Sequence, residues 1–419
     1  MCSELFRIPM TWQGVPIFGF GLLLAAWCIV GGAVLWNVRK GPSGASEVWG
    51  YLPALALGAI AIVALPRLMP SGLPIRGYGL MVLLGSVAGL WMAGFRARQA
   101  GLSVEVIHGL AFWMFILGIL GARLFFVIEY WEERFSCGDW RETLVEALKF
   151  TEGGLVVYGA LAGAMLAFVG YTLKHRLPPL AMADLIAPSL VAGLALGRLG
   201  CLLNGCCYGG VTDVPWAVQF PADSLPTIEQ ARRGTLFGLT LTDGAAGVDV
   251  LAVVEASPGA EAGLVEGDTI RAAGGYGVRN RAELADALLA TVREGRPLAL
   301  QVGDRAVLLN PPASVRSRPI HPTQIYSAVN AALLCWLLWT FYAFRRSEGE
   351  VTALMLLLYP VARFLLEVIR VDESPVFGTE MSISQNISLA VFVLAAAAML
   401  WLRSRNEPRL DFPLATVPA

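Results

Sequence analysis

An arginine stands at the end of a long apolar stretch of this chain. Residues 185–196 are almost wholly apolar, and Arg198 follows them in the sequence Gly-Arg-Leu-Gly-Cys. An ionised side chain at membrane depth costs about 2.5–3.5 kcal/mol on insertion scales, so such residues are rare and mark functional sites. Arginine keeps its proton, and its planar guanidinium matches the oxygens of a phosphate. We therefore expect a protein that binds a phosphate-bearing molecule at the membrane, in the first place a phospholipid.

A second group of polar residues lies near the C-terminus. Tyr359, Arg363, Glu367 and Arg370 follow one another at intervals of four, four and three residues. At about 100° per residue these positions share one narrow face of a helix. Their neighbours are apolar, so this face must meet a cavity or its own charged partners instead of lipid. A structural pair of Arg363 and Glu367 is the simpler alternative. Together with Arg198, the stripe predicts two or three guanidinium groups around one anionic headgroup.

The composition is that of a membrane protein. Of 419 residues, 56% are hydrophobic and 15% are charged, whereas soluble domains carry about 25% charged residues. The net charge of −1 gives no reason to expect a nucleic-acid partner. There is no His-Glu-x-x-His helix and no Gly-x-Ser-x-Gly with a spaced histidine, which disfavours an intramembrane protease. The seven cysteines suggest no disulfide framework.

The apolar stretches predict an α-helical polytopic protein with about nine transmembrane helices, each of about 20 residues. Basic residues cluster after alternate stretches, and the positive-inside rule puts that side in the cytoplasm. The N-terminus is then outside, the C-terminus is cytoplasmic, and residues 205–320 face the exterior of a bacterial plasma (inner) membrane. The predicted spans are 15–36, 51–69, 78–97, 107–130, 154–173, 181–200, 325–344, 351–370 and 385–402.

Charged residues and short β-type alternations appear between 236 and 312. The turn of Phe237, Gly238 and Leu239, a Gly-Leu…Gly-Asp segment within 257–270 and a helix near 282–293 resemble a bacterial PDZ domain, a small α/β fold. In such domains this turn offers backbone N–H groups to a peptide carboxylate, and the peptide adds as a strand. The resemblance implies that these three residues bind a peptide ligand. The alternative is an insert that only braces the membrane domain.

Residues Gly197–Gly209 resemble the signature of the bacterial prolipoprotein diacylglyceryl transferases, G-R-x-G-N-F-x-N-G-E-x-x-G. The similarity covers 72–235 and 313–405. It leaves 1–71 as an extra N-terminal pair of spans, 236–312 as the PDZ-like extracytoplasmic domain and 406–419 as a cytoplasmic tail. Further short motifs follow the family order, at 78–81, 121–124, 153–155, 215–221, 321–326 and 359–370.

The resemblance implies a transfer reaction. Such enzymes move the diacylglyceryl group of phosphatidylglycerol, or a related phospholipid, to the lipobox cysteine thiol of a prolipoprotein precursor. A thioether forms, glycerol-1-phosphate leaves, and neither a metal nor a cofactor is needed. The chemistry requires cations that hold the phosphate and stabilise charge as the carbon–oxygen bond breaks. It also requires a thiolate, because the thiolate is the nucleophile.

Motif positions imply a role for individual residues. Arg198 binds the phosphate, Arg363 assists it, and Glu367 orients Arg363. Arg370 holds a neighbouring helix end or a headgroup. Tyr359 completes this group, and the other substrate-binding positions are Tyr78, Arg123, Asn204 and Gly209.

This chain departs from the family at the position of its histidine. In the G-G-L-x-x-x-G segment that histidine is replaced by Tyr158. Tyrosine, with an ordinary pKa near 10, is a poor general base at neutral pH unless cations depress that value. His321 is a substitute base, and helix-entry packing beside Pro322 is the alternative use for it. The loss of the histidine also motivates a second hypothesis, a non-catalytic lipid- or peptide-binding protein of the same fold.

Two further departures lie in the signature itself. Cys201 stands at the signature's asparagine and Cys206 at its glutamate. The adjacent pair of Cys206 and Cys207 has three alternative uses: a redox site, an acceptor site or the packing of small residues.

Overall fold

The computed structural model describes residues 4–40, 45–135, 139, 143, 145–147, 154, 156–313, 315–370, 378 and 381–404. Gly153 and Leu155 of the predicted glycine motif and the predicted tail 406–419 lie outside these residues. The chain divides into two compact units, residues 2–80 and residues 81–419, and each is described by itself.

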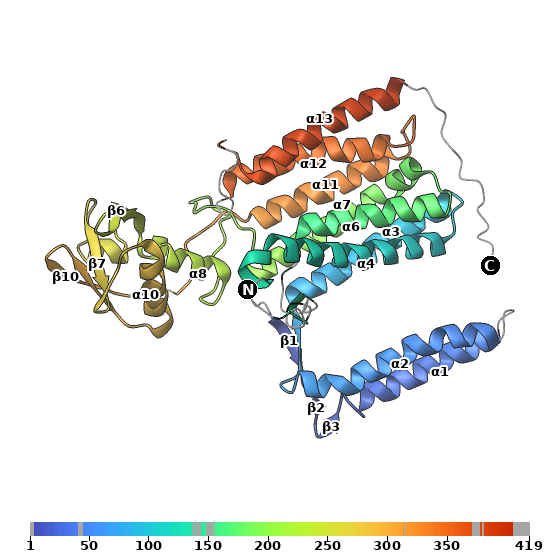
Figure 1. Ribbon diagram of the computed structural model, residues 1–419, viewed down its shortest axis with the longest axis horizontal. Coiled ribbons are helices and arrows are strands. Elements are labelled where there is room, and N and C mark those ends of the chain that lie inside the picture. The colour runs from blue at the N-terminus through green and yellow to red at the C-terminus, as the bar shows by residue number, and fades with distance from the viewer. Residues whose placement is uncertain are drawn as a thin grey trace. The chain divides into compact units, whose positions relative to one another are not determined.

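The first unit contains two helices and two small antiparallel sheets. Helices α1 (Leu22–Arg39) and α2 (Ala45–Leu68) form a hairpin (Figure 1), in which the Trp27 indole donates a hydrogen bond to the Leu55 carbonyl at 3.0 Å. Strand β1 (Glu4–Ile8) pairs with β4 (Leu73–Arg76), and β2 (Thr11–Trp12) pairs with β3 (Val15–Pro16). The first predicted span begins too early, because residues 11–16 form this short hairpin and the helix starts only at Leu22.

Seven of the described helices are long and apolar enough to cross a membrane, so the protein is a multi-pass membrane protein. Their ends lie close to those predicted. The described apolar parts of α1 and α2 are shorter, at 22–37 and 55–67, so the total of nine spans stays a prediction. The seven are α3 (Gly77–Gln99), α4 (Val104–Glu129), α6 (Val157–Lys174), α7 (Pro179–Asn204), α11 (Thr323–Phe341), α12 (Glu350–Ile369) and α13 (Ile383–Ser404).

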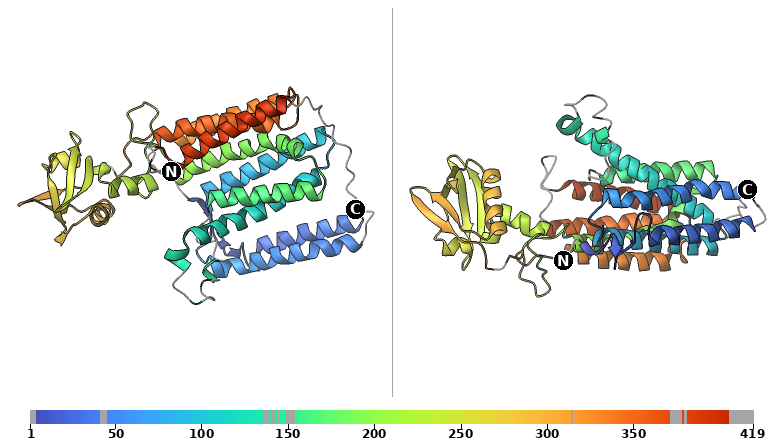
Figure 2. Two further views of the ribbon diagram at one scale, coloured as in Figure 1. Left: turned by 45° about the horizontal axis from the view of Figure 1, so that its top comes forward. Right: turned by 90° about the horizontal axis from the view of Figure 1, so that it is seen from below.

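Small residues let two of these helices approach closely. A Cβ atom at Gly121 of α4 would lie 2.4 Å from the Gly159 carbonyl oxygen, and one at Gly163 would lie 2.0 Å from the Leu117 carbonyl oxygen. Only glycine fits at such a contact, so Gly121, Gly159 and Gly163 allow α4 and α6 to pack closely. Figure 2 shows the helices of this bundle side by side in two further views. Gly197 of α7 makes no such contact, because no heavy atom lies within 4 Å of its Cβ position.

One end of the bundle, called the head end here, is where α7 ends at Asn204, α11 begins at Thr323 and α12 ends at Ile369. At the opposite end a buried carboxylate connects α7 to the start of α12. Asp184 accepts hydrogen bonds from the N–H of Gly349 at 2.7 Å and from the N–H and hydroxyl of Thr352 at 2.8 and 2.9 Å. The side chain of Asp184 is fully buried.

Two arginine contacts complete that arrangement, which we call the Asp184 clamp. Arg345 lies 3.9 Å from Asp184 and 3.3 Å from Glu348, and it donates to the Tyr342 carbonyl at 2.7 Å. All the charged groups of the clamp are therefore buried together with partners. The clamp fixes the start of α12 against α7, and so fixes the helix that carries the polar stripe.

The inserted region contains an antiparallel sheet in the order β10-β9-β7-β6-β5, with β8 (Tyr276–Gly277) paired to β7. Helix α10 (Arg281–Glu294) begins with a capping box, in which Asn280 accepts from the Glu283 N–H at 3.0 Å and Glu283 accepts from the Arg279 N–H at 2.8 Å. The remaining elements are β5 (Leu239–Gly244), β6 (Gly247–Val253), α9 (Pro258–Glu261), β7 (Thr269–Ala273), β9 (Leu298–Val302) and β10 (Arg305–Leu309).

Two antiparallel segments lead into and out of this insert. The Phe220 N–H donates to the Ser317 hydroxyl at 2.8 Å, and the Ser317 N–H donates to the Phe220 carbonyl at 2.9 Å. One step nearer the bundle, Val218 and Ile320 exchange two backbone N–H···O hydrogen bonds, each of 3.1 Å. Helix α8 (Leu225–Arg232) and the 3-10 turn η3 (Thr235–Phe237) follow the first segment.

Candidate active site at the head end

The loop that follows α7, residues 205–211, is shaped by two left-handed residues. Gly205 ends the helix with φ +75°, and the Cys206 N–H then donates to the Cys201 carbonyl at 3.1 Å. Cys207 also has a positive φ, +59°, which is uncommon for a residue with a side chain and costs about 1 kcal/mol or more. The chain thereby turns back over the last turn of α7, and Cys206 and Cys207 come close to Cys201.

Neighbouring helices hold this loop in place. The Gln324 amide donates to the Cys206 carbonyl and the Thr323 hydroxyl to the Cys207 carbonyl, both at 2.7 Å. The Gly209 N–H donates to the His321 carbonyl at 3.0 Å, and Gly209 also pairs with Arg370 at the end of α12. A Cβ at Gly209 would lie 2.7 Å from that of His321, so glycine is required there for packing. The loop therefore joins the ends of α7, α11 and α12.

Arg198 lies two turns from the end of α7 and is half-buried. Within the described part of the chain, its guanidinium has no hydrogen bond and no carboxylate partner. The pKa of the Cys207 thiol is lowered, chiefly by hydrogen bonds from the thiols of Cys201 and Cys206. The positive charges of Arg370 and Arg198 lower it further. Guanidinium groups from α7 and α12 thus act on the same loop.

The polar stripe of α12 is internally paired. The Arg363 guanidinium bonds to the Glu367 carboxylate and donates to the Ser384 hydroxyl of α13 at 2.9 Å. Arg370 lies 3.8 Å from the same carboxylate. The structural Arg363–Glu367 pair considered from the sequence is therefore present. Two arginines share one carboxylate, so the stripe keeps a net positive charge. Tyr359, its first member, lies one turn before Arg363 on α12.

Arg123, at the end of α4, binds main-chain carbonyl groups. Its guanidinium donates to Glu146 at 2.6 Å, to Ala147 at 2.8 Å and to Gly154 at 3.1 Å. These bonds position the segment that precedes α6 and Tyr158. The contacts of Arg123 are those of a positioning residue.

The two bases considered from the sequence have different surroundings. The ring of His321 lies 3.3 Å, through Nδ1, from the Tyr326 hydroxyl, which also accepts a hydrogen bond from the Trp216 indole at 2.6 Å. The His321 backbone N–H donates to the Gly210 carbonyl, so His321 is bonded to the loop of residues 205–211. Tyr158 lies in the first turn of α6 with 41% of its surface exposed. Among the described residues, no hydrogen bond joins it to that loop.

Two other predicted positions lie at helix ends. Asn204 is the last residue of α7, and its side chain forms a hydrogen bond with the Cys206 thiol. Tyr78 is in the first turn of α3 and belongs to the unit of residues 2–80.

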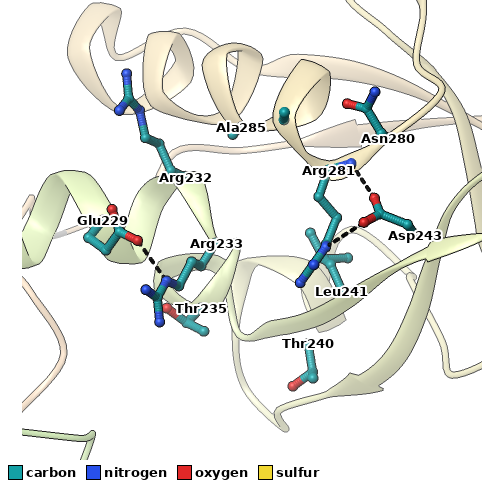
Figure 3. Close-up of a pocket in the computed structure, with 11 residues that line it drawn as sticks. Glu229, Arg232, Arg233, Thr235, Thr240, Leu241, Asp243, Asn280, Arg281 and Ala285 are labelled. Carbon is teal, nitrogen blue, oxygen red and sulfur yellow. Dashed lines mark hydrogen bonds and ion pairs between the residues drawn. The ribbon is translucent and has the colours of Figure 1, made fainter. Parts of the chain in front are cut away.

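The insert has a groove of its own, shown in Figure 3, with a volume of about 590 Å³. It lies between β5, the start of α10 and α8. Two ion pairs line it, Arg233–Glu229 at 2.7 Å and Arg281–Asp243 at 3.2 Å. The complete lining is Glu229, Arg232, Arg233, Thr235, Thr240, Leu241, Asp243, Asn280, Arg281, Ala282 and Ala285.

The predicted peptide turn does not line this groove. The N–H groups of Phe237 and Leu239 donate to the Gly234 carbonyl, and that of Gly238 donates to the Thr235 carbonyl. Phe237 and Leu239 are buried in the core of the insert. The groove instead runs along β5, whose outer edge has no strand partner among the described residues.

Sequence reasoning singled out Arg198 and the stripe of α12, but it missed the convergence of three cysteines. The sulfur atoms of Cys201, Cys206 and Cys207 all lie within 4.8 Å of one another. A helix-ending glycine between the first cysteine and the adjacent pair is the signal that predicts this turn.

Comparison with known proteins adds to this geometry. The family model described as prolipoprotein diacylglyceryl transferase matches residues 66–401. A protein of Rhodopirellula baltica is 35% identical over 97% of this chain and 90% of its own length. Proteins of Corynebacterium efficiens and Gloeobacter violaceus are 27% and 25% identical, each over 80% of this chain and over 80% and 91% of their own lengths. All three bear the name phosphatidylglycerol–prolipoprotein diacylglyceryl transferase.

Proposed function

This chain belongs to the prolipoprotein diacylglyceryl transferase family, and we propose that the residues of its head end carry out the reaction of that family. The protein is a multi-pass inner-membrane enzyme that transfers the diacylglyceryl group of phosphatidylglycerol to a prolipoprotein. The acceptor sulfur forms a bond to the glycerol carbon, the carbon–oxygen bond breaks, and its electron pair leaves with glycerol-1-phosphate. The acceptor thiol must lose a proton in the process.

Arg198 binds the lipid phosphate, and its lack of a hydrogen-bond or carboxylate partner among the described residues is the observation that carries this proposal. An arginine at a span end that had only a structural role would need a carboxylate or carbonyl group nearby. An unpaired guanidinium is instead ready to donate two parallel hydrogen bonds to phosphate oxygens. The charge that develops on the leaving group is stabilised by the same contact.

The stripe of α12 supplies the second cation. Glu367 orients Arg363 and Arg370 at once, and the remaining positive charge faces the same anion as Arg198. The positive charges of Arg370 and Arg198 both act on Cys207, and these two guanidinium groups bind the leaving phosphate together. Tyr359 and Asn204 line the lipid site, and Gly209 shapes the loop beside it.

His321 accepts the proton of the acceptor thiol. Its backbone is bonded into residues 205–211 and its ring is held by Tyr326. Tyr158, with 41% of its surface exposed, contacts the lipid and does not take the proton of the acceptor thiol.

The head end faces the exterior, with nine spans in all, an external N-terminus and a cytoplasmic C-terminus. The insert is then an extracytoplasmic PDZ-like domain. The outer edge of β5, which has no strand partner among the described residues, and the groove beside α10 bind an extended peptide as an added strand.

The proposal is tested with purified full-length protein, labelled phosphatidylglycerol and a precursor peptide that contains the lipobox cysteine. We expect label on this peptide and none on a matched peptide with serine at that position. A family enzyme in a parallel reaction controls for the substrates. Without label on the peptide under conditions in which that enzyme is active, the proposed function is wrong.

A further inference from the structure

The three cysteines at the head end have the geometry of a metal site. A zinc–thiolate bond is about 2.3 Å long, so two sulfur atoms on one tetrahedral zinc ion lie about 3.8 Å apart. All three sulfur atoms here lie within 4.8 Å of one another, which one ion can span after small rotamer changes. A disulfide would use only two of the three thiols and leave the third unexplained.

The loop brings these side chains together before any ligand arrives. Gly205 reverses the chain, and Cys207 is held in a left-handed conformation that its side chain disfavours. Gln324 and Thr323 fix the carbonyl groups of the cysteine pair at 2.7 Å each. Strain of this kind persists where the surroundings determine it, and it is concentrated at functional sites. The cysteines are half-buried, so both an ion and a peptide can reach them.

We propose that Cys201, Cys206 and Cys207 bind one zinc ion and that its open fourth position binds the acceptor thiol of the prolipoprotein. This inference rests on the proposed function and names the means by which the thiol is activated. Catalytic zinc sites use three protein ligands and leave one position for water or substrate. A thiol that coordinates zinc is deprotonated outright, so the ion supplies what the replaced family histidine does not.

The charges of the surrounding groups fit such a complex. Four thiolates carry −4 against +2 on the ion, and Arg198 and Arg370 supply the balancing +2. The acceptor thiol displaces a water molecule, and His321 or solvent takes the proton. Sulfur then forms the carbon–sulfur bond as the glycerol-1-phosphate oxygen leaves with its electron pair. The neutral thioether is a weak ligand, and water replaces it. Nothing is oxidised or reduced.

The binding arm of the test uses the full-length protein in detergent, stripped with a chelator and then titrated with zinc. We expect one zinc ion per chain. Each of the variants Cys201→Ser, Cys206→Ser and Cys207→Ser should bind zinc with at least about tenfold lower affinity. Cys335→Ser, a half-buried cysteine of α11, is the matched control and keeps the ion. A protein that binds no zinc through these cysteines, or that holds a disulfide among them, would overturn the proposal.

The chemical arm replaces zinc with cobalt(II), whose spectrum reports its ligands. We expect a sulfur-to-cobalt charge-transfer band in the wild-type protein. This measurement needs no variant, so it still tests the proposal if a serine variant does not fold. The band changes when the lipobox peptide is added and stays constant with the serine peptide. No change with the cysteine peptide contradicts thiol binding. Full transfer activity after zinc removal would contradict the metal step and leave the proposed function standing. A cobalt response without transfer of label to the peptide would contradict the proposed function and leave the metal site standing.

Discussion

The two ends of the membrane bundle carry charged residues in different ways. In the Asp184 clamp, each buried charge has a partner, and Asp184 alone accepts three hydrogen bonds from the start of α12. At the head end Arg198 is half-buried with no partner in the part of the chain that the structure describes, and two arginines share the carboxylate of Glu367. The presence of a protein partner, and not burial or membrane depth, therefore distinguishes a charged group that stabilises the fold from one that is available to bind a ligand.

The first prediction breaks the clamp. Asp184→Ala leaves the N–H groups of Gly349 and Thr352 buried without this acceptor and removes one of the two carboxylates beside the buried Arg345, so we expect a loss of about 3–5 kcal/mol in the free energy of unfolding. Denaturant titration in detergent measures it. The folded fraction should transfer label at nearly the wild-type rate, because the clamp lies at the opposite end of the bundle from the head end. Wild-type stability would mean that the clamp is not structural.

The second prediction is the opposite case. Arg198→Ala lowers the transfer rate by about 10²–10³-fold, because one preorganised donor to the developing charge is lost. The same change alters the free energy of unfolding by no more than about 0.5 kcal/mol, since no protein partner is abandoned. Arg198→Lys keeps the charge but loses the planar fork, and it should recover only part of the rate. A large loss of stability in Arg198→Ala would reverse the comparison.

The third prediction sharpens the comparison within the head end. Glu367→Gln removes the negative charge that orients two arginines, and we expect a transfer rate lower by about 10- to 100-fold, in line with about 1.5–3 kcal/mol for a charge-assisted hydrogen bond. Ser384→Ala is the matched control, because it removes only the neutral contact of Arg363; it should cost about threefold. Equal effects would show that the carboxylate has no special part in orienting Arg363.

The smallest effect is expected at Tyr158. Tyr158→Phe should change the transfer rate by less than about threefold, because the thiol proton goes elsewhere. His321→Ala should cost more than this change does. A general base contributes about 10²–10⁴-fold, so a loss of that size in Tyr158→Phe would identify tyrosine as the base.

Much of the membrane domain was predictable from local sequence. Apolar runs of about 20 residues gave the helices to within a few residues, and the spacing from Tyr359 to Arg370 placed the stripe on one face. The first span began late because Gly14 and Pro16 favour a turn that hydropathy does not detect. Helix existence depends on neighbouring residues, and these are visible in the sequence.

The contacts between distant segments were not predictable. Asp184 and its partner Gly349 are 165 positions apart, and Arg123 reaches carbonyl groups about 23–31 residues away. The turn that joins Cys201 to the cysteine pair depends on the backbone angles of Gly205 and Cys207, which composition does not reveal. The sequence singled out Arg198, but the buried pairing of Arg345 with Asp184 and Glu348 is visible only in the structure.

The ladder between Phe220 and Ser317 has one more implication, for the origin of the chain. The chain leaves the membrane domain toward the insert and returns from it through two paired segments, and Pro221 lies opposite Arg316 as the next pair toward the insert. A single genetic deletion between those points would leave two ends already in register. A related protein that lacks the insert, or that carries a different one, would therefore keep the head end of its membrane bundle intact.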